Sequence, residues 1–174
     1  MFPLLLAIQI VDIEAVRATG DPAAAIHNVA PPDRPATIDC DIVVAGAGAG
    51  GFAAAIRAAE RGHSVCLTEE TSWIGGQITA GGVSALDEHK FIELAGGTRT
   101  YYQLREGIRV YYRARYKIKE DTAAFNPGAC YVSALCFEPQ AALAALNKML
   151  GPYRDRVNLL LRTQIGRASC RERV

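Results

Sequence analysis

Runs of apolar and polar positions predict a strand, a helix and a second strand in the first half of the chain. Residues 40–46 (CDIVVAG) hold four consecutive apolar residues from Ile42, which is typical of a strand buried on both faces. Residues 51–62 (GFAAAIRAAERG) follow as a helix that ends at Gly62. Residues 64–68 then supply a second strand that ends in Glu69. This order predicts one βαβ unit and an α/β fold.

The second half of the chain is predicted to be more helical. Residues 98–119 have helical spacing of apolar positions, with Thr98 or Thr100 as the cap, although Gly107 lowers the helix propensity. Residues 121–139 are rich in loop signals. Residues 139–150 form an apolar-striped helix that begins with Pro139, and residues 157–163 form another buried strand.

Both ends of the chain are set apart from this domain. The segment PPDRP, residues 31–35, interrupts regular structure, so the domain is expected to begin near Thr37. Residues 1–36 are interpreted as a leader, either an apolar secretory signal or a disordered segment. Residues 165–174 (IGRASCRERV) match a translated sequencing adapter and are expected to be a non-native tail. Residues 37–164 are then the N-terminal part of a longer domain.

Composition narrows the class of protein. The chain has 174 residues, is 50% hydrophobic and carries a formal net charge of +1. These values favour a globular protein and give no support to a nucleic-acid partner. No apolar run reaches the length of about 18 residues that a membrane span needs. The five cysteines lack the spacing of a disulfide scaffold or a metal site, so Cys40 and Cys66 are interpreted as small hydrophobic residues in buried strands.

A glycine motif lies between the first predicted strand and helix. In the pattern Gly46-x-Gly48-x-x-Gly51, the first glycine permits a tight turn, the second lets a pyrophosphate approach the backbone, and the third lets the helix pack on the strand. The helix N-terminus offers N–H groups to phosphates. Glu69 follows at about the distance of 20 residues that suits a ribose-binding acid. The motif predicts dinucleotide binding, and the alternative is a glycine-rich structural turn.

Later segments resemble a known family. Glu69 is followed by Gly75 and Gly76, inside the segment WIGGQITAGGVSALDEH. With GGTRTYYQLREGIRVYYR and CFEPQAALAALNKML, this segment resembles the FAD-dependent oxidoreductases, which include, more distantly, the flavoprotein subunit of heterodisulfide reductases. The resemblance covers about residues 41–164. It implies a Rossmann-type FAD-binding fold with a parallel sheet, which is incomplete in this chain.

The resemblance also implies which residues bind the cofactor. Gly46, Gly48 and Gly51 would line the FAD pyrophosphate, and Glu69 would bind the adenosine ribose. A second group would lie along the middle of the cofactor or near its isoalloxazine. The complete set of implied cofactor-binding residues is Gly46, Gly48, Ala49, Gly50, Gly51, Glu69, Glu70, Gly75, Gly76 and Gln77.

The implied activity is oxidation or reduction of an unidentified small substrate by hydride or electron transfer through FAD. Two alternatives remain, an NAD-dependent dehydrogenase and a non-catalytic truncated nucleotide-binding fragment. Some relatives carry an iron–sulfur cluster, but this sequence shows no ligand run for one. The sequence names no metal site, no electron partner and no catalytic base. A cytoplasmic location and export to the periplasm are both left open.

Three further groups of residues carry possible chemistry. Arg105, Arg109 and Arg113 would bind an anionic substrate or, as we favour, form a solvated basic face. The run of residues 87–89, Asp-Glu-His, suits acid–base chemistry or, again preferred, an ordinary hydrogen-bonded loop. Residues 130 and 136 are both cysteines, but their position in the chain argues against a catalytic disulfide.

Overall fold

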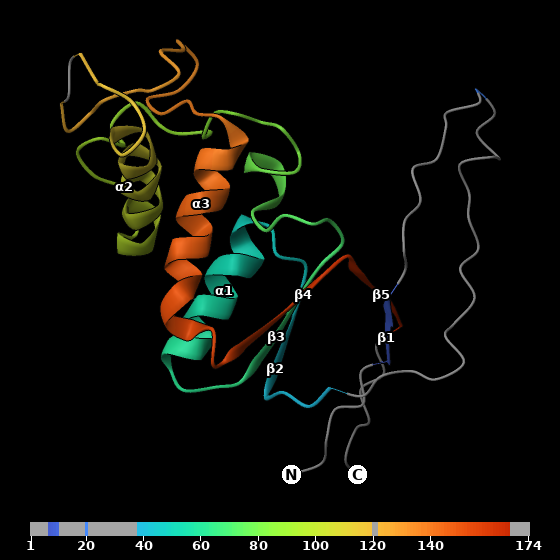
Figure 1. Ribbon diagram of the computed structural model, residues 1–174. Helices are drawn as coiled ribbons and strands as arrows, with labels where there is room; N and C mark the ends of the chain where they lie inside the picture. The colour runs from blue at the N-terminus through green and yellow to red at the C-terminus, as the bar shows by residue number, and fades with distance from the viewer. Residues whose placement is uncertain (1–6, 11–19, 21–37, 120–121, 168–174) are drawn as a thin grey trace.

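The architecture was determined from a computed structural model, which describes residues 7–10, 20, 38–119 and 122–167. In chain order the elements are β1 (Ala7–Ile10), β2 (Ile42–Ala45), α1 (Ala49–Glu60), β3 (Val65–Glu69), η2 (Gly76–Ile78), α2 (Arg99–Arg113), α3 (Pro139–Leu150), η3 (Gly151–Tyr153), β4 (Val157–Leu161) and β5 (Thr163–Arg167). Strands and helices are interspersed along the chain, with α2 and α3 both between β3 and β4 (Figure 1).

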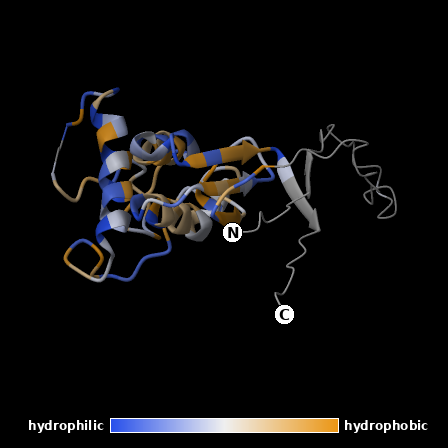
Figure 2. Ribbon diagram, turned by 90° about the horizontal axis from the view of Figure 1, so that it is seen from below, coloured by the Kyte–Doolittle hydropathy of each residue, from blue (hydrophilic) through white to orange (hydrophobic). Residues whose placement is uncertain are grey.

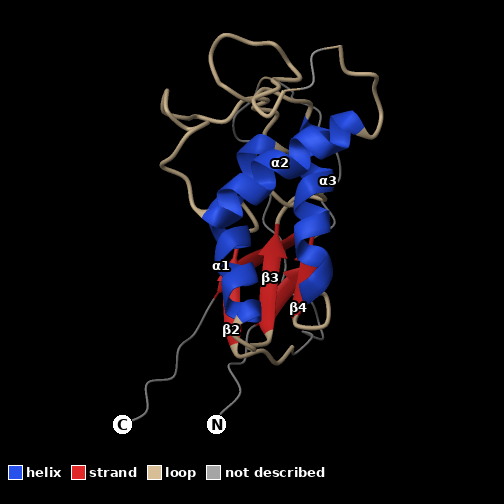
Figure 3. Ribbon diagram, turned by 90° about the vertical axis from the view of Figure 1, so that its left-hand side faces the viewer, coloured by secondary structure: helices blue, strands red, loops and turns tan. Residues whose placement is uncertain are grey.

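Strands β2, β3 and β4 form a parallel sheet in that order. Ile42 pairs with Val65, and Val65 pairs in turn with Val157. Helices α1 and α3 cover one face of this sheet, and α2 packs against α3 (Figures 1 and 3). The predicted α/β class and parallel sheet are therefore confirmed. Because the strands are parallel, the turns that follow β2 and β3 lie at the same edge of the sheet.

The three strands differ in burial. All residues of β3 are buried, as expected for the central strand of the sheet. Residues 40–46 were predicted to form a strand buried on both faces and residues 157–163 another buried strand. The predicted burial is wrong for both, because β2 and β4 are only partly covered. Among the described residues each of these strands has one neighbour in the parallel sheet, which leaves its outer edge open. β4 also ends earlier than predicted, where Arg162 takes a positive φ of 53°.

The core lies between the sheet and its covering helices. Phe52 and Ile56 of α1 pack with Leu146 of α3 against Leu67 of β3, and all four are buried. Figure 2 shows hydrophobic residues along the strands of the sheet and mixed hydropathy along the helices. This matches the sequence pattern, in which strands are apolar runs and helices are amphipathic.

Helix α2 begins after Thr98, whose side chain accepts a hydrogen bond from the Tyr101 N–H at 3.2 Å. The helix passes through Gly107 without a break and ends at Arg113, before the predicted limit of 119. A Cβ at position 107 would lie 2.9 Å from the Cβ of Ala145. The glycine therefore allows α2 and α3 to pack closely, which offsets its low helix propensity. Helix α3 has the bounds that the sequence predicted.

A second, antiparallel pair of strands joins the two ends of the chain. Ala7 pairs with Arg167, and Ile10 pairs with Thr163. Neither β1 nor the part of β5 after residue 164 was predicted as a strand, because both lie in segments interpreted as a leader and a non-native tail. The rest of residues 1–36, apart from residue 20, and residues 168–174 lie outside the described residues. Within the described part of the chain, no helix is long and apolar enough to cross a membrane.

Four cysteines form two disulfide bonds. Cys40 is bonded to Cys66 and Cys130 to Cys136, with Cα–Cα distances of 5.9 and 6.0 Å. The interpretation of Cys66 as a buried residue of a strand is confirmed, but Cys40 lies before β2 and is half-buried, and the expectation that these cysteines do not form a disulfide is wrong. Cys40 precedes β2, and the pairing of β2 with β3 brings it beside Cys66, so the contact comes from the sheet rather than from spacing in the sequence.

Candidate nucleotide-binding site

The glycine motif forms the turn between β2 and α1, at the carboxyl end of the parallel strands. Gly46 has a φ of +91°, a conformation that favours glycine, and its N–H donates to Thr68 Oγ1 at 3.2 Å. Gly48 is extended and caps α1. Helix geometry leaves the first N–H groups of α1 without acceptors inside the helix. The turn therefore presents backbone donors and the positive end of a helix dipole.

The motif glycines occupy different surroundings. A Cβ at Gly51 would overlap the carbonyl oxygen of Gly46 and lie 3.3 Å from a methyl group of Val44. Gly51 is therefore needed for close packing of α1 on β2. At Gly46, Gly48 and Gly50, a Cβ would meet no atom within 4 Å. Packing within the described structure does not explain why positions 48 and 50 hold glycine rather than a residue with a side chain. The open space beside these glycines is compatible with a bound group.

A second glycine pair packs directly on this turn. Gly75 and Gly76 have φ values of +110° and +57°. The Gly75 N–H donates to the carbonyl oxygen of Ala47 at 2.7 Å. A Cβ at Gly76 would lie 3.0 Å from the Cα of Gly48. The structure thus brings together the two glycine loops that the sequence placed along one ligand.

Glu69 ends β3 beside the turn and is 7% exposed. Its Oε2 accepts from the Ala47 N–H at 3.1 Å. Its Oε1 accepts from the N–H and the Oγ1 of Thr71 at 3.0 and 2.9 Å. A carboxylate has about four acceptor positions, so one further hydrogen bond can be accommodated. The carboxylate of Glu69 therefore holds the turn at Ala47 in place.

The remaining candidate residues lie at the surface of the same region. Ala49 and Gly50 are exposed in the first turn of α1. Gln77 is exposed in η2, immediately after the second glycine pair. Glu70 is exposed as well, so the two consecutive acids have different environments.

Two threonines that support this site were missed by the sequence analysis. Thr68 is 2% exposed and accepts from the turn at Gly46, while Thr71 donates twice to Glu69. The available signal was their position: both hydroxyl residues lie within two residues of the acid that ends a strand. Hydroxyl groups there can reach the backbone and carboxylate of the neighbouring turn.

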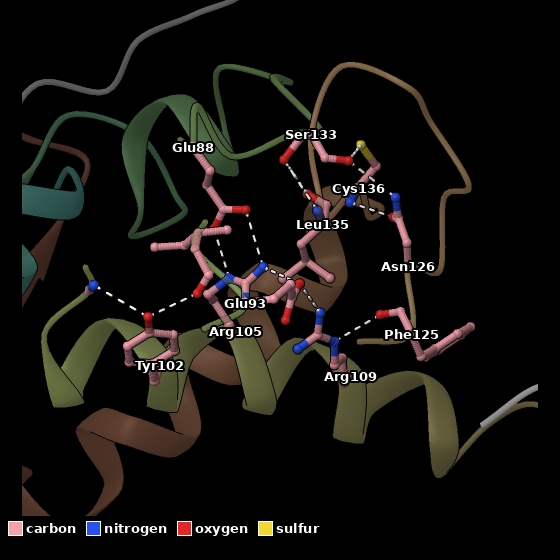
Figure 4. Close-up of polar contacts among 12 residues, drawn as sticks. Glu88, Glu93, Tyr102, Arg105, Arg109, Phe125, Asn126, Ser133, Leu135 and Cys136 are labelled. Carbon is pink, nitrogen blue, oxygen red and sulfur yellow. Dashed lines mark hydrogen bonds and ion pairs between the residues drawn. The ribbon is translucent and has the colours of Figure 1, made fainter. Parts of the chain in front are cut away.

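Arg105 and Arg109 do not form a solvated basic face, and that preferred interpretation is wrong for both. They are 1% and 4% exposed. Arg105 binds Glu88 through two hydrogen bonds of 2.7 and 3.2 Å and Glu93 through one of 2.7 Å. Arg109 donates to Glu93 and to the Phe125 carbonyl oxygen, at 2.7 and 2.8 Å (Figure 4). Buried arginine is stable only with such partners.

Contacts within this cluster shift the pKa values of Glu93, Arg105 and Tyr101. Hydrogen bonding by Arg105 lowers the pKa of Glu93 against the opposing effect of burial, and Arg109 adds to the lowering. Burial favours a lower pKa for Arg105, but the bonds to Glu93 and Glu88 outweigh it and raise the value. Burial and the hydrogen bond to Glu88 raise the pKa of Tyr101. Arg105 and Arg109 of α2 therefore join this helix to the loop that contains Glu88 and Glu93, and Arg109 also joins it to the loop at Phe125.

The other candidate groups are dispersed. Arg113 pairs with Glu106 on the partly exposed end of α2. Asp87 and His89 are exposed, whereas the side chain of Glu88 is 1% exposed and paired with Arg105, so these three neighbours do not form one site. The preferred interpretation of residues 87–89 as a loop with ordinary hydrogen bonds holds for Glu88, which accepts hydrogen bonds from Arg105 and Tyr101. Among the described residues, no group of three or more His, Cys, Asp or Glu side chains is arranged to hold a metal ion.

The parallel sheet, the βαβ unit and the glycine turn define a Rossmann-type nucleotide-binding domain. The family model described as "FAD dependent oxidoreductase" matches residues 41–174, and the chain belongs to that family. The predicted family and its cofactor, FAD, are thereby confirmed.

Two characterised relatives match over shorter segments. The chain is 46% identical over 78 residues to the N,N-dimethylglycine/sarcosine dehydrogenase of Chromohalobacter salexigens. This matched segment covers 45% of this chain and 10% of the relative. It is 46% identical over 56 residues to the urocanate reductase of Eggerthella lenta, covering 32% of this chain and 9% of the relative. The matched segments thus span about a tenth of each relative's length.

Solved structures give a weaker likeness. An oxidized steroid monooxygenase bound to NADP matches with a TM-score of 0.36 and 19% identity, over 69% of this chain and 19% of that chain. Mycobacterium smegmatis Sdh1 in complex with UQ1 matches with a TM-score of 0.35 and 16% identity, over 71% of this chain and 27% of that chain.

Proposed function

We propose that the turn between β2 and α1 binds the pyrophosphate of FAD. The observation that carries the proposal is the open space at Gly48 and Gly50, where a Cβ would meet no atom within 4 Å. Gly51, three residues after Gly48, is explained by packing alone, so the glycines at 48 and 50 need another reason. The N-terminal N–H groups of α1 supply donors and a positive potential for phosphate oxygens beside that space.

We further propose that Glu69 accepts a hydrogen bond from a ribose hydroxyl of the adenosine half. The carboxylate lies at the end of β3, next to the turn, and its two existing partners, Ala47 and Thr71, hold it in place. A buried anion at this position also disfavours a ribose phosphate by charge repulsion. Gly75, Gly76 and Gln77 would then follow the cofactor away from the turn. Ala49 and Glu70 complete the set at the rim.

The proposed activity of the whole protein is FAD-dependent oxidation or reduction of a small substrate. When bound, the flavin supplies the hydride or electron transfer, and this chain contributes the binding and orientation of the cofactor. The relatives are named as a dehydrogenase and a reductase, which supports the reaction class and leaves the substrate open. Residues 37–164 are proposed to be the N-terminal part of the FAD-binding domain.

The test is a binding measurement on the 174-residue chain. The chain is mixed with FAD or with NAD, freed of unbound nucleotide on a desalting column, and examined for retained absorbance and quenched flavin fluorescence. We expect FAD to be retained and NAD to be lost. Retention of NAD without FAD would instead support the NAD-dependent alternative.

A matched pair of variants tests the site itself. Gly48→Ala adds a methyl group into the open space, where the extended backbone tolerates alanine. We expect this variant to keep the melting temperature of the unmodified chain and to weaken FAD binding at least about tenfold. The control is Asp155→Asn, a change at an exposed position after η3. Equal FAD affinity in all three proteins would overturn the proposed site.

A further inference from the structure

Both disulfides join segments that the structure holds by other means as well. Cys40–Cys66 lies at the amino ends of β2 and β3, opposite the glycine turn. Beside it, the carboxylate of Asp41 accepts from the N–H and Oγ of Ser64, each at 2.8 Å. The Asp41 N–H donates back to the Ser64 carbonyl oxygen at 3.1 Å. A covalent bond and a hydrogen-bonded clamp therefore fix the start of the same strand pair.

Cys40–Cys66 is half-buried at Cys40 and buried at Cys66, and it lies away from the proposed cofactor site. Cys66 is 1% exposed and belongs to the fully buried strand β3. The glycine turn follows the carboxyl end of β2, so the strand itself lies between the disulfide and the turn. Cys40–Cys66 is placed to crosslink the sheet rather than to exchange electrons with a bound flavin.

Cys130–Cys136 closes a partly exposed loop that is hydrogen-bonded to Asn126. Asn126 donates to the carbonyl oxygen of Cys130 at 3.3 Å. It also donates to the carbonyl oxygen of Ser133 at 3.2 Å, and its Oδ1 accepts from the Cys136 N–H at 2.8 Å (Figure 4). At the tip, Tyr131 is 99% exposed, so that side chain does not pack into the core. Leu135 and Cys136 at the end of this loop are buried, so polar bonds and the crosslink are needed mainly to shape its exposed tip.

We infer that this chain matures in an oxidising compartment, where Cys40–Cys66 and Cys130–Cys136 form as structural disulfides. This inference is independent of the proposed FAD site. Cα–Cα distances of 5.9 and 6.0 Å lie in the range that disulfides require. All four described cysteines are paired, and reducing systems of the cytosol keep such thiols apart.

The chemistry of each bond is thiol–disulfide exchange with a disulfide-donating oxidoreductase. One cysteine thiolate attacks the donor's disulfide and forms a mixed disulfide, which breaks the donor's S–S bond. The second cysteine thiolate of the pair then attacks its partner's sulfur and displaces the donor. The donor leaves as a dithiol with two electrons, and the two cysteine protons pass to the donor or the solvent.

The experiment compares the 174-residue chain made in a bacterial periplasm with the same chain made in a reducing cytosol. Each sample is quenched in acid, alkylated at its free thiols and digested without reductant, and its peptides are identified by mass spectrometry. From the periplasm we expect peptides linking Cys40 to Cys66 and Cys130 to Cys136, with Cys170 alkylated. From the cytosol we expect alkylation of all five cysteines and a lower melting temperature.

Cysteine variants of the periplasmic chain separate the two crosslinks. Cys40→Ser opens a sequence separation of 26 residues and Cys130→Ser one of 6. The longer loop gains more entropy when it is released, so Cys40→Ser should lower the melting temperature more, by about 10 °C. Cys170→Ser, outside the described residues, is the control and should change neither the melting temperature nor the linked peptides.

Three results would overturn the inference. The first is a periplasmic chain with five alkylated cysteines. The second is a different pairing, such as a peptide linking Cys40 to Cys130. The third is an equal melting temperature for the oxidised and the reduced chain, which would show that the bonds do not support the fold. The peptide map of the unsubstituted chain identifies the pairing even if Cys40→Ser does not fold.

Discussion

The carboxylate of Glu69 is hydrogen-bonded to the backbone N–H of Ala47, so the end of β3 is tied to the middle of the glycine turn at 3.1 Å. The residue expected to bind ribose therefore also holds the turn that is proposed to bind phosphate. Removing its charge should affect both properties, because one side chain serves the ligand and the local fold.

We predict that Glu69→Gln weakens FAD binding about tenfold and lowers the free energy of unfolding by about 1–3 kcal/mol. The amide places a donor where two acceptor oxygens now receive N–H and O–H groups, and hydrogen bonds to a charged group are worth more than neutral ones. Flavin fluorescence titration and urea unfolding measure the two effects. Full FAD affinity in this variant would remove Glu69 from the proposed site.

Gly51 and Gly50 are adjacent in α1 but should respond oppositely to alanine. A Cβ at Gly51 would overlap the Gly46 carbonyl oxygen, which is backbone and cannot move without shifting β2 or α1. We expect Gly51→Ala to destabilise the chain by about 3 kcal/mol. Gly50→Ala meets no atom and should leave stability unchanged or raise it by up to about 1 kcal/mol. Thermal unfolding of the two variants without nucleotide tests this contrast, and equal losses would contradict it.

We predict that Arg105, which anchors α2, contributes strongly to the free energy of unfolding. Replacing it with methionine would leave the buried carboxylate of Glu88 without its two charged hydrogen bonds. Breaking a buried ion pair from one side costs about 3–5 kcal/mol. The matched control is Arg57→Met, which removes the exposed pair with Glu60 and should cost less than about 1 kcal/mol. Denaturant unfolding of the two variants compares the losses, and a similar loss in both would show that burial does not matter here.

The cluster of Arg105, Arg109, Glu88 and Glu93 also predicts that the free energy of unfolding depends on pH. The pKa of Glu93 is lowered, first by hydrogen bonding to Arg105, so the folded state binds its proton less readily than the unfolded chain does. The resulting stabilisation is complete above the ordinary carboxyl pKa, about 4.3, and is lost as the pH falls through the lower folded value.

We therefore expect the free energy of unfolding to fall as the pH is lowered from about 5 to about 3. Glu93→Gln should be less stable at neutral pH and should show a shallower decline over this interval. Glu106→Gln, which alters an exposed pair with Arg113, should retain the slope of the unmodified chain. Urea unfolding at several pH values measures the slopes, and identical slopes for the two variants would contradict the assignment.

The regular elements of the fold were readable from the sequence because each has a local cause. Apolar runs marked β2 and β3, Pro139 marked the start of α3, and Thr98 was one of two candidate caps for α2. These signals act within a few residues. The glycine turn was equally local, since one motif contains the strand end, the turn and the helix start.

The contacts that were missed depend on partners far along the chain. Arg105 and Arg109 lie four residues apart on α2, a spacing that suits a solvated face as well as a buried cluster. Their acidic partners Glu88 and Glu93 lie in a segment without periodic structure. The partnership of Cys40 with Cys66 likewise follows from the pairing of two strands. A pattern read along one segment does not contain such information.

The outer edge of β2, with which no described strand pairs, has a consequence for the behaviour of the chain in concentrated solution. Along that edge, backbone N–H and C=O groups face away from β3, and the strand is short, apolar and without charged side chains. Such an edge is a template for another strand. Molecules of the 174-residue chain should therefore associate through β2 as their concentration rises, and any polypeptide that adds a strand there would keep them apart.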